Sequence, residues 1–412
     1  MRGLASPKDA DRDLWRQNLP VEFRLALAAA RWPLKERDRI EISQLASNQL
    51  NWKWFTRIVE RNQILPLVYH NLRSALTDPL HAEILRSLRD AALADTGHSM
   101  AQAAELVRIT NSVRSAGLEI VALKGVALSV LAYGNLSIRS TGDIDLLAPA
   151  TQVSDIERVL IGLGYTRFEP GAELTPKRLK HYLRYYKHFV YFSEKGAPLE
   201  LHWRLYHNPL LKKAGFEFPP TAPVTIGSGV VSTISKNEMF LYLSAHGANH
   251  GWPILKWLAD IGALLSLMTA EDLRRVAELA SERGLSGELR AALLLVELLL
   301  AVEAPAVDLG SDGNLVAERV VKMSLRLLSA ENYCLEIQRL PRLGMFLYDL
   351  RLRSSWRYRS EEIRRSLLFP DDWELIDLPD ALFSLYAVIR PVSWLVRHFP
   401  RPSRRQPTLD RP

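Results

Sequence analysis

Residues 123–149 read LKGVALSVLAYGNLSIRSTGDIDLLAP, and two aspartates near the end of this stretch, Asp143 and Asp145, alternate with apolar residues. Such alternation is typical of a β-strand, in which every second side chain lies on the same face. The two carboxylates therefore point the same way, while Ile144 and Leu146 point into the core.

The residues before the aspartates predict a strand, a glycine turn and a short helix. LEIVAL, at 118–123, reads as a strand, and GVALSVLAY, at 125–133, reads as a helix. Gly134 and Asn135 then predict a turn that leads towards the second strand, DIDLLAP, at 143–149.

The whole chain reads as an α+β (α/β) protein, with a small mixed-sheet core between helical regions. FVYFSE and LELHWRL predict two further strands, and Ser235 with Glu238 has the spacing of a helix-opening capping box. We expect four regions: an N-terminal helical domain (1–115), the mixed-sheet core (116–215), a second helical domain (216–345), and C-terminal helices with a disordered basic tail (346–412).

Two carboxylates on one strand face repel each other and raise each other's pKa unless a cation lies between them. Mg²⁺ suits such a position, because it takes one or two carboxylates and completes its shell with water and substrate phosphates. Glu200, on the strand LELHWRL, offers a third carboxylate. Two ions, Mg²⁺ or alternatively Mn²⁺, held by Asp143, Asp145 and Glu200 would support phosphoryl or nucleotidyl transfer. The alternative is structural, since STGD is ordinary turn chemistry before a strand.

The stretch at 123–147 resembles the glycine-then-DxD signature of the DNA polymerase β-like nucleotidyltransferase superfamily, and LELHW resembles its third-carboxylate strand. It also resembles a group of bacterial nucleotidyltransferases with an LKG…R…DID pattern and a later segment like SAHGANHGWPILKWLADIGALL. This resemblance implies a palm-like core in which Asp143, Asp145 and Glu200 are the catalytic metal ligands. The implied reaction moves NMP from an NTP to an acceptor hydroxyl and releases pyrophosphate.

The resemblance, together with nearby basic residues, also implies nucleotide-binding side chains. We hypothesise that Lys124 and Gly125 lie near the phosphates and that Arg139 neutralises phosphate charge. The nucleotide-binding candidates are Lys124, Gly125, Arg139, Thr141, Lys187, His188, His202, His246, His250, Lys256 and Asp260. Val126 stands where the superfamily usually has a small hydroxyl or a glycine, and this supports the alternative of a non-catalytic nucleotide sensor or scaffold.

Two further patterns have competing interpretations. His246 and His250 would share one helix face, but Gly247 replaces the glutamate of the zinc-peptidase motif, so we expect nucleotide contact or packing between helices rather than zinc. KRLKHYLRYYKH, at 177–188, would guide a triphosphate or an RNA backbone, or form a solvated helix face.

Composition constrains the compartment and the partners. The net charge is +7 and leans towards the C-terminus, which a solvated arginine-rich helix face explains better than a nucleic-acid partner. The single cysteine, Cys334, excludes an intrachain disulfide and fits a reducing compartment. The first twenty or so residues carry charges where a signal peptide needs its apolar stretch, so the cytoplasm is expected.

The acceptor is not evident from the sequence. ATP is the first choice of NTP, and a small molecule or peptide natural product ranks before a tRNA end or a protein side chain, because no RNA-binding module is recognisable. DALFSLYAVIRPVSWLVRHF, at 380–399, mixes apolar and basic residues, but packing on the protein itself is expected over peripheral membrane contact. No oligomeric state follows from these patterns.

Overall fold

The computed structural model describes residues 18–194, 197–206, 208–211, 218–311, 313–328, 342–353 and 355–398 of the chain. The expectations for the N-terminal residues before 18, for Cys334 and for the basic tail after 398 fall outside these ranges.

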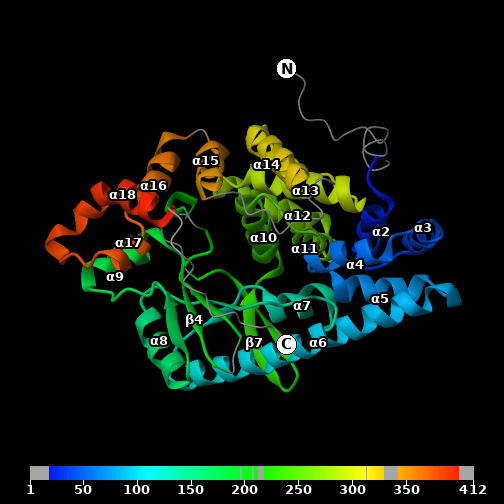
Figure 1. The fold of residues 1–412 in the computed structure, drawn as a ribbon, viewed down its shortest axis with the longest axis horizontal. Coiled ribbons are helices and arrows are strands. Elements are labelled where there is room, and N and C mark those ends of the chain that lie inside the picture. Colours follow the sequence, from blue (N-terminus) through cyan, green and yellow to red (C-terminus); the bar gives the residue numbers. More distant parts are fainter. Residues whose placement is uncertain are drawn as a thin grey trace.

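A seven-stranded mixed sheet lies between helical regions, which confirms the expected α+β class (Figure 1). The strand order is β3-β4-β5-β2-β1-β7-β6. The strands are β1 (Val121–Ala122), β2 (Ile144–Leu147), β3 (Thr166–Glu169), β4 (His188–Phe192), β5 (Leu199–His202), β6 (Thr221–Ile226) and β7 (Gly229–Ile234). The strand expected over 118–123 is only two residues long in the structure. β7 pairs in parallel with β1, so the β6–β7 hairpin extends the sheet on that side.

Side-chain alternation along the central strands separates two hydrophobic cores. Ile144 and Leu146 of β2 face one core, which α6 (Ala82–Ser115) and α8 (Val153–Gly162) cover. Leu147 of β2 belongs to the other core, on the side of α10 (Lys236–His250) and α11 (Leu255–Leu265). Figure 1 shows α6 running along the sheet, with α10 and α11 beyond its other side. The polar residues of the strands therefore face α10 and α11.

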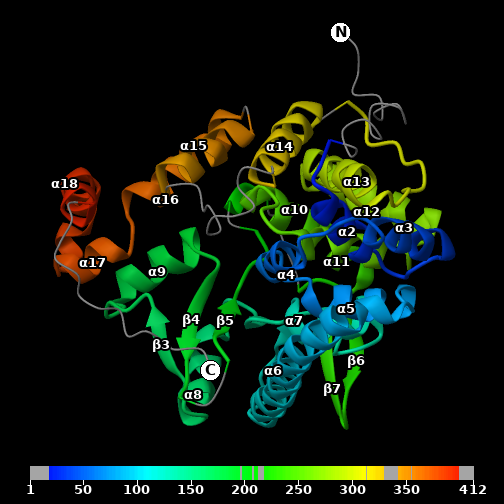
Figure 2. The same cartoon turned by 45° about the vertical axis from the view of Figure 1, so that its right-hand side comes forward.

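The helices before α6 pack beside the helices that follow the sheet, as Figure 2 shows. They are α2 (Val21–Ala29), α3 (Glu36–Ala46), α4 (Trp52–Arg61) and α5 (Leu65–Ala75), followed by the short η1 (Pro79–His81). Asn71 joins α5 to the end of α2 by donating to the carbonyls of Ala29 and Arg31. The buried Arg31 pairs with Asp38 of α3 at 2.8 Å.

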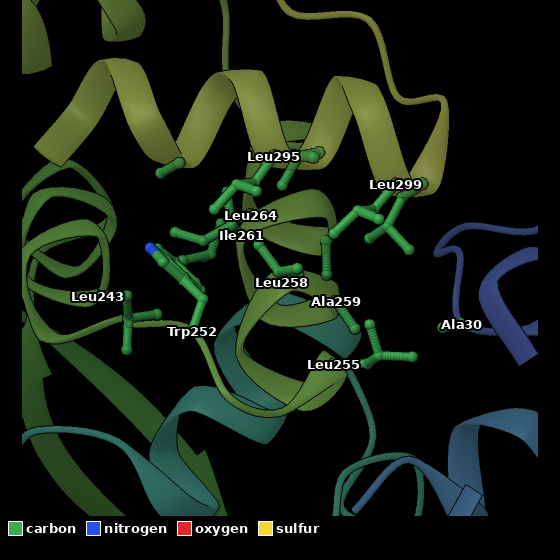
Figure 3. Close-up of a cluster of buried hydrophobic side chains, with 14 of the residues drawn as sticks. Ala30, Leu243, Trp252, Leu255, Leu258, Ala259, Ile261, Leu264, Leu295 and Leu299 are labelled. Carbon is green, nitrogen blue, oxygen red and sulfur yellow. The ribbon is translucent and has the colours of Figure 1, made fainter. Parts of the chain in front are cut away.

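Helices α10 and α11 form a continuous core with α12 (Ala270–Glu282) and α13 (Ser286–Leu300). Ser235 caps α10 by accepting from the backbone N–H of Glu238, as the capping-box spacing predicts. Figure 3 shows Leu295 of α13 over Leu258 of α11, and both are fully buried. Burying one such leucine contributes roughly 1.5–3 kcal/mol.

The C-terminal helices return to the sheet. They are α14 (Asn314–Leu327), α15 (Arg342–Leu352), α16 (Trp356–Leu367), α17 (Asp371–Leu375), η4 (Asp380–Leu385) and α18 (Tyr386–His398). Trp373 and Tyr386 are buried in the core that includes Tyr182 of α9 (Pro176–Tyr185). Phe383 and Tyr386 thus pack on the protein itself, whereas Val388 and Val392 of α18 are exposed. Among the described helices, none combines the length and the apolar character needed to cross a membrane.

Candidate active site

Three carboxylates gather on the sheet face that looks towards α10 and α11. β2 and β5 pair in parallel with Asp145 directly opposite Glu200, so these two side chains share a face. Asp143 lies two residues before Asp145, just ahead of β2. One carboxylate oxygen from each residue lies within 4.8 Å of the others. The three residues that the sequence proposes as metal ligands are thus close enough to share a hard cation.

The three carboxylates differ in their exposure to solvent. The Asp145 side chain is fully buried, whereas those of Asp143 and Glu200 are 37% and 25% exposed. The charge of Asp145, followed by burial, raises the pKa of Asp143. The negative charges of the carboxylates therefore repel one another, and a bound cation would reduce this repulsion.

A glycine turn brings the start of α7 (Gly125–Tyr133) against the aspartates. Gly125 has a φ of +60°, and a Cβ at this position would lie 3.2 Å from the carbonyl oxygen of Asp143. The left-handed backbone and the close approach both favour glycine here. Val126, which departs from the superfamily pattern, is 2% exposed and packs in the core behind the sheet. Its place in the fold is thus that of a packing residue.

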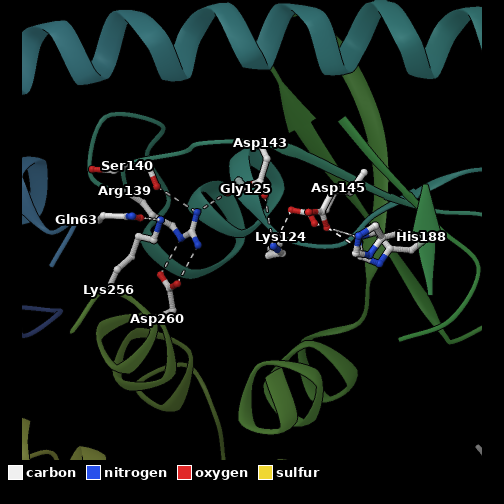
Figure 4. Close-up of polar contacts among 12 residues, drawn as sticks. Gln63, Lys124, Gly125, Arg139, Ser140, Asp143, Asp145, His188, Lys256 and Asp260 are labelled. Carbon is white, nitrogen blue, oxygen red and sulfur yellow. Dashed lines mark hydrogen bonds and ion pairs between the residues drawn. The ribbon is translucent and has the colours of Figure 1, made fainter. Parts of the chain in front are cut away.

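Lys124 supplies a cation to the aspartates. Its Nζ lies 3.0 Å from Oδ2 of Asp145 and 3.8 Å from Oδ2 of Asp143 (Figure 4). Burial alone would lower the pKa of Lys124, but the charges of Asp145 and Asp143 outweigh it and raise that pKa well above its usual value. Lys124 is therefore a permanent positive charge within the cluster.

Two histidines flank Glu200. His202 Nε2 lies 3.1 Å from Asp145 Oδ1 and 3.0 Å from Glu200 Oε2, so its N–H donates towards the two carboxylates. His188 Nδ1 lies 3.7 Å from the same Glu200 oxygen. Burial would raise the pKa of Glu200, but the hydrogen bond from His202 and the charges of His188, His202 and Lys124 hold it well below the usual value. Burial lowers the pKa of His188 well below its usual value.

Arg139 and Asp260 pair with each other beside the carboxylates (Figure 4). The guanidinium donates to both Asp260 oxygens, at 2.8 and 3.0 Å, and Tyr133 Oη donates to the same carboxylate at 3.0 Å. Arg139 Nη1 also lies 3.4 Å from the carbonyl oxygen of Gly125. Arg139 is only 5% exposed, and its contact with Gly125 joins the loop before β2 to the Gly125 turn.

Two other nucleotide-binding candidates have protein partners. Thr141 Oγ1 donates to Ser99 Oγ of α6 at 3.0 Å. Lys256, at the start of α11, donates to Gln63 Oε1, and burial followed by the charge of Arg139 lowers the pKa of Lys256 to about 8. Figure 4 places Lys256 close to the Arg139–Asp260 pair.

The histidines of α10 belong to an aromatic group. The rings of His246 and His250 are 4.8 Å apart, and Trp257 lies 4.9 Å from His246 and 5.4 Å from His250. Within the described part of the chain, neither histidine joins a group with metal-ligand spacing. Gly247 is explained by packing, because a Cβ there would lie 2.4 Å from the ring of Trp252. Burial is the main reason that the pKa values of His246 and Lys187 are lowered.

Three residues near the site were not anticipated from the sequence. Tyr242 is buried on α10, its hydroxyl has no hydrogen-bond partner among the described residues, and its charge interaction with Lys124 places it beside the cluster. Its spacing of one helical turn before His246 was an available signal. Tyr133 donates a hydrogen bond to Asp260, and Gln63 accepts one from Lys256. Both partners are distant in the sequence, so no local pattern identifies these two residues.

Residues 48–301 match a protein family described as uncharacterised nucleotidyltransferases. Because the match covers more than half of the 412 residues, the chain belongs to this nucleotidyltransferase family, and nucleotidyl transfer (EC 2.7.7) is its enzyme class. A comparison with curated proteins finds no match.

Proposed function

We propose that the chain transfers NMP from an NTP to an acceptor hydroxyl and releases pyrophosphate, with Asp143, Asp145 and Glu200 as the metal-binding carboxylates. The pairing of Asp145 with Glu200 across β2 and β5, with Asp143 within the same 4.8 Å cluster, is the observation that carries the proposal. The Gly125 turn beside it supports assignment to the DNA polymerase β-like superfamily.

The donor set fits Mg²⁺. All three ligands are carboxylates, and two of them are partly exposed. Among the described residues, Oδ2 of the buried Asp145 has no hydrogen-bond donor, and it forms an ion pair with Lys124. Mg²⁺ prefers such hard oxygen ligands, and the partial exposure of Asp143 and Glu200 suits an ion that also binds water and phosphates. Bound there, Mg²⁺ supplies charge neutralisation of the triphosphate and of the attacking oxygen.

The protein residues have separable roles in this reaction. The acceptor oxygen forms a bond to the α-phosphorus while the bond from that phosphorus to the bridging oxygen breaks, and pyrophosphate leaves with the electron pair. The lowered pKa of Glu200 keeps it ionised, which suits a ligand and makes it a poor base. We therefore assign metal binding alone to Glu200, and the acceptor proton passes to water. Lys124, whose Nζ lies 3.0 Å from Asp145 Oδ2, would pair with phosphate oxygens.

Arg139 and Asp260 are better explained as positioning residues. The charge of Arg139 is already compensated by Asp260, and the pair is buried, so phosphate contact would require breaking it. Its link to the Gly125 carbonyl instead keeps the turn in register with Asp143. This replaces the initial hypothesis of direct phosphate neutralisation by Arg139 with a structural role.

The nucleotide and the acceptor are proposed more broadly. ATP is the first NTP to test, and a small molecule or peptide is the first acceptor class. A tRNA end or a protein side chain is the alternative acceptor class, and nucleotide binding without transfer is the alternative function.

A transfer assay with α-labelled NTPs tests the proposal. Wild type and Asp145→Asn are incubated with Mg²⁺, each NTP and separate pools of small metabolites, peptides and tRNA. The proposal predicts labelled product and stoichiometric pyrophosphate in wild type, with at least a roughly hundredfold loss in the folded variant. Metal-dependent nucleotide binding without pyrophosphate from any pool would favour the sensor function instead.

A further inference from the structure

Two imidazoles share Glu200 with the carboxylate cluster. His188 begins β4 and His202 ends β5, and the two residues lie directly opposite each other in the antiparallel ladder. Their ring centroids are 4.8 Å apart. Glu200 and His202 are two residues apart on β5 and therefore lie on the same face. One ring nitrogen from each histidine and one Glu200 oxygen lie within 4.8 Å of one another.

Both imidazoles have an unused nitrogen. Nδ1 of His188 and Nδ1 of His202 are buried and have no hydrogen-bond partner among the described residues. A buried polar atom without a partner costs about 1–3 kcal/mol, and His188 Nδ1 lies only 3.7 Å from Glu200 Oε2, so a ligand bound beside Glu200 would give this nitrogen a partner.

The carboxylates of Glu200 and Asp145 favour a cation as that ligand. His202 Nε2 lies 3.0 Å from Glu200 Oε2 and 3.1 Å from Asp145 Oδ1, so Nε2 is the His202 nitrogen that lies beside the carboxylates. A cation bound there would replace the proton on Nε2. Glu200 Oε2 lies between the two imidazoles, 3.7 Å from His188 Nδ1 and 3.0 Å from His202 Nε2, and contributes the negative charge.

We propose that His188, His202 and Glu200 form a second cation site, which takes a divalent first-row transition metal such as Mn²⁺ in preference to Mg²⁺. Imidazole nitrogen suits Zn²⁺ and Fe²⁺ best, and Mn²⁺ accepts it together with carboxylate oxygen, whereas Mg²⁺ selects an all-oxygen shell. Glu200 lies in both groups, so it would contribute a carboxylate oxygen to both sites. The two histidines are the basis for this site, which does not depend on nucleotidyl transfer being the function. If the proposed function is correct, the reaction would use two chemically different ions.

Nitrogen ligation of Mn²⁺ tests the second site. Chelator-treated full-length protein receives excess Mg²⁺, which fills the oxygen site, and then less than one equivalent of Mn²⁺ without nucleotide. Pulsed EPR reports whether nitrogen nuclei couple to the bound Mn²⁺. We expect imidazole coupling in wild type, and a loss of at least roughly tenfold in Mn²⁺ affinity with weakened coupling in His188→Phe.

Three further variants separate the outcomes. His98→Phe is the matched control, because His98 lies on α6 with Gln102 as its partner and should leave the coupling and the affinity unchanged. His188→Gln is a smaller change for use if His188→Phe does not fold. Asp143→Asn should abolish nucleotidyl transfer and keep the nitrogen coupling, so failure of the proposed function is distinguishable from failure of this site. Oxygen-only Mn²⁺ in wild type, or coupling and affinity unchanged in the His188 variants, would overturn the proposal.

Discussion

Replacing Gly125 by alanine should damage both the fold and the site, whereas the same change at Gly134 should damage the fold alone. The two glycines bracket α7 and both have left-handed backbones, with φ of +60° and +66°. A Cβ at Gly134 meets nothing within 4 Å, but a Cβ at Gly125 lies 3.2 Å from the Asp143 carbonyl oxygen. Gly134→Ala is therefore a control with matched backbone strain.

The structure sets the size of each effect. A left-handed alanine costs about 1–2 kcal/mol, and the lower entropy of its unfolded chain offsets about 0.4–1 kcal/mol, so Gly134→Ala should lose about 1 kcal/mol. At Gly125 the Asp143 carbonyl must also move, and the next residue, Ile144, is held by a 2.9 Å hydrogen bond to Pro198. We expect Gly125→Ala to lose roughly 2–3 kcal/mol.

Urea denaturation followed by tryptophan fluorescence measures the stability loss, and calorimetry with and without Mg²⁺ measures nucleotide affinity. Displacing Asp143 should weaken Mg²⁺-dependent nucleotide binding by roughly tenfold or more in Gly125→Ala, with no change in Gly134→Ala. Equal stability losses in the two variants, together with unchanged nucleotide affinity, would refute the argument that Gly125 positions Asp143.

Other buried charges give three further tests. Asp260→Asn leaves Arg139 buried without its counterion and should lower the free energy of unfolding by roughly 3–5 kcal/mol, whereas Arg139→Met/Asp260→Leu should recover part of the loss in the same denaturation assay. Burial lowers the pKa of Lys256 from 10.5 to about 8, so the folded state disfavours its charge at pH 7. Lys256→Met should therefore raise the free energy of unfolding by roughly 2–3 kcal/mol at pH 7. Between pH 8 and 10.5 the wild type loses the charge of Lys256 and becomes more stable, so the difference between variant and wild type should shrink. A difference that does not change with pH would contradict this. Lys124→Met removes the cation between the aspartates, so Mg²⁺ should raise its unfolding temperature more than that of wild type; an equal rise would show that Lys124 and Mg²⁺ do not compete.

Local patterns were sufficient for the centre of the fold. Alternation around Asp143 and Asp145 predicts which side chains share a face, and the register of Asp145 with Glu200 puts the third carboxylate where the strand pattern suggests. The β6–β7 hairpin received no assignment because Thr221–Ile226 and Gly229–Ile234 lie next to the start of a long helical region and their pairing with β1 is distant in sequence.

The sequence could not predict the roles of residues whose partners lie far away along the chain. Arg139 and Asp260 are 121 residues apart, and either residue alone is equally consistent with a phosphate contact or an ion pair. Lys256 and Gln63 are 193 residues apart. Such buried pairs depend on how helices dock on the sheet, which hydrophobic periodicity does not specify.

A thermal-shift series with ATP, GTP, CTP and UTP, each with and without Mg²⁺, tests whether the carboxylate cluster binds a metal–nucleotide complex. Nucleotide at a hundredfold excess over Kd should stabilise the folded protein by about 2.7 kcal/mol. We predict a Mg²⁺-dependent shift with at least one nucleotide in wild type and its loss in folded Asp143→Asn/Asp145→Asn. An equal shift in the double variant, or no shift with any nucleotide in wild type, would contradict the assignment of the site.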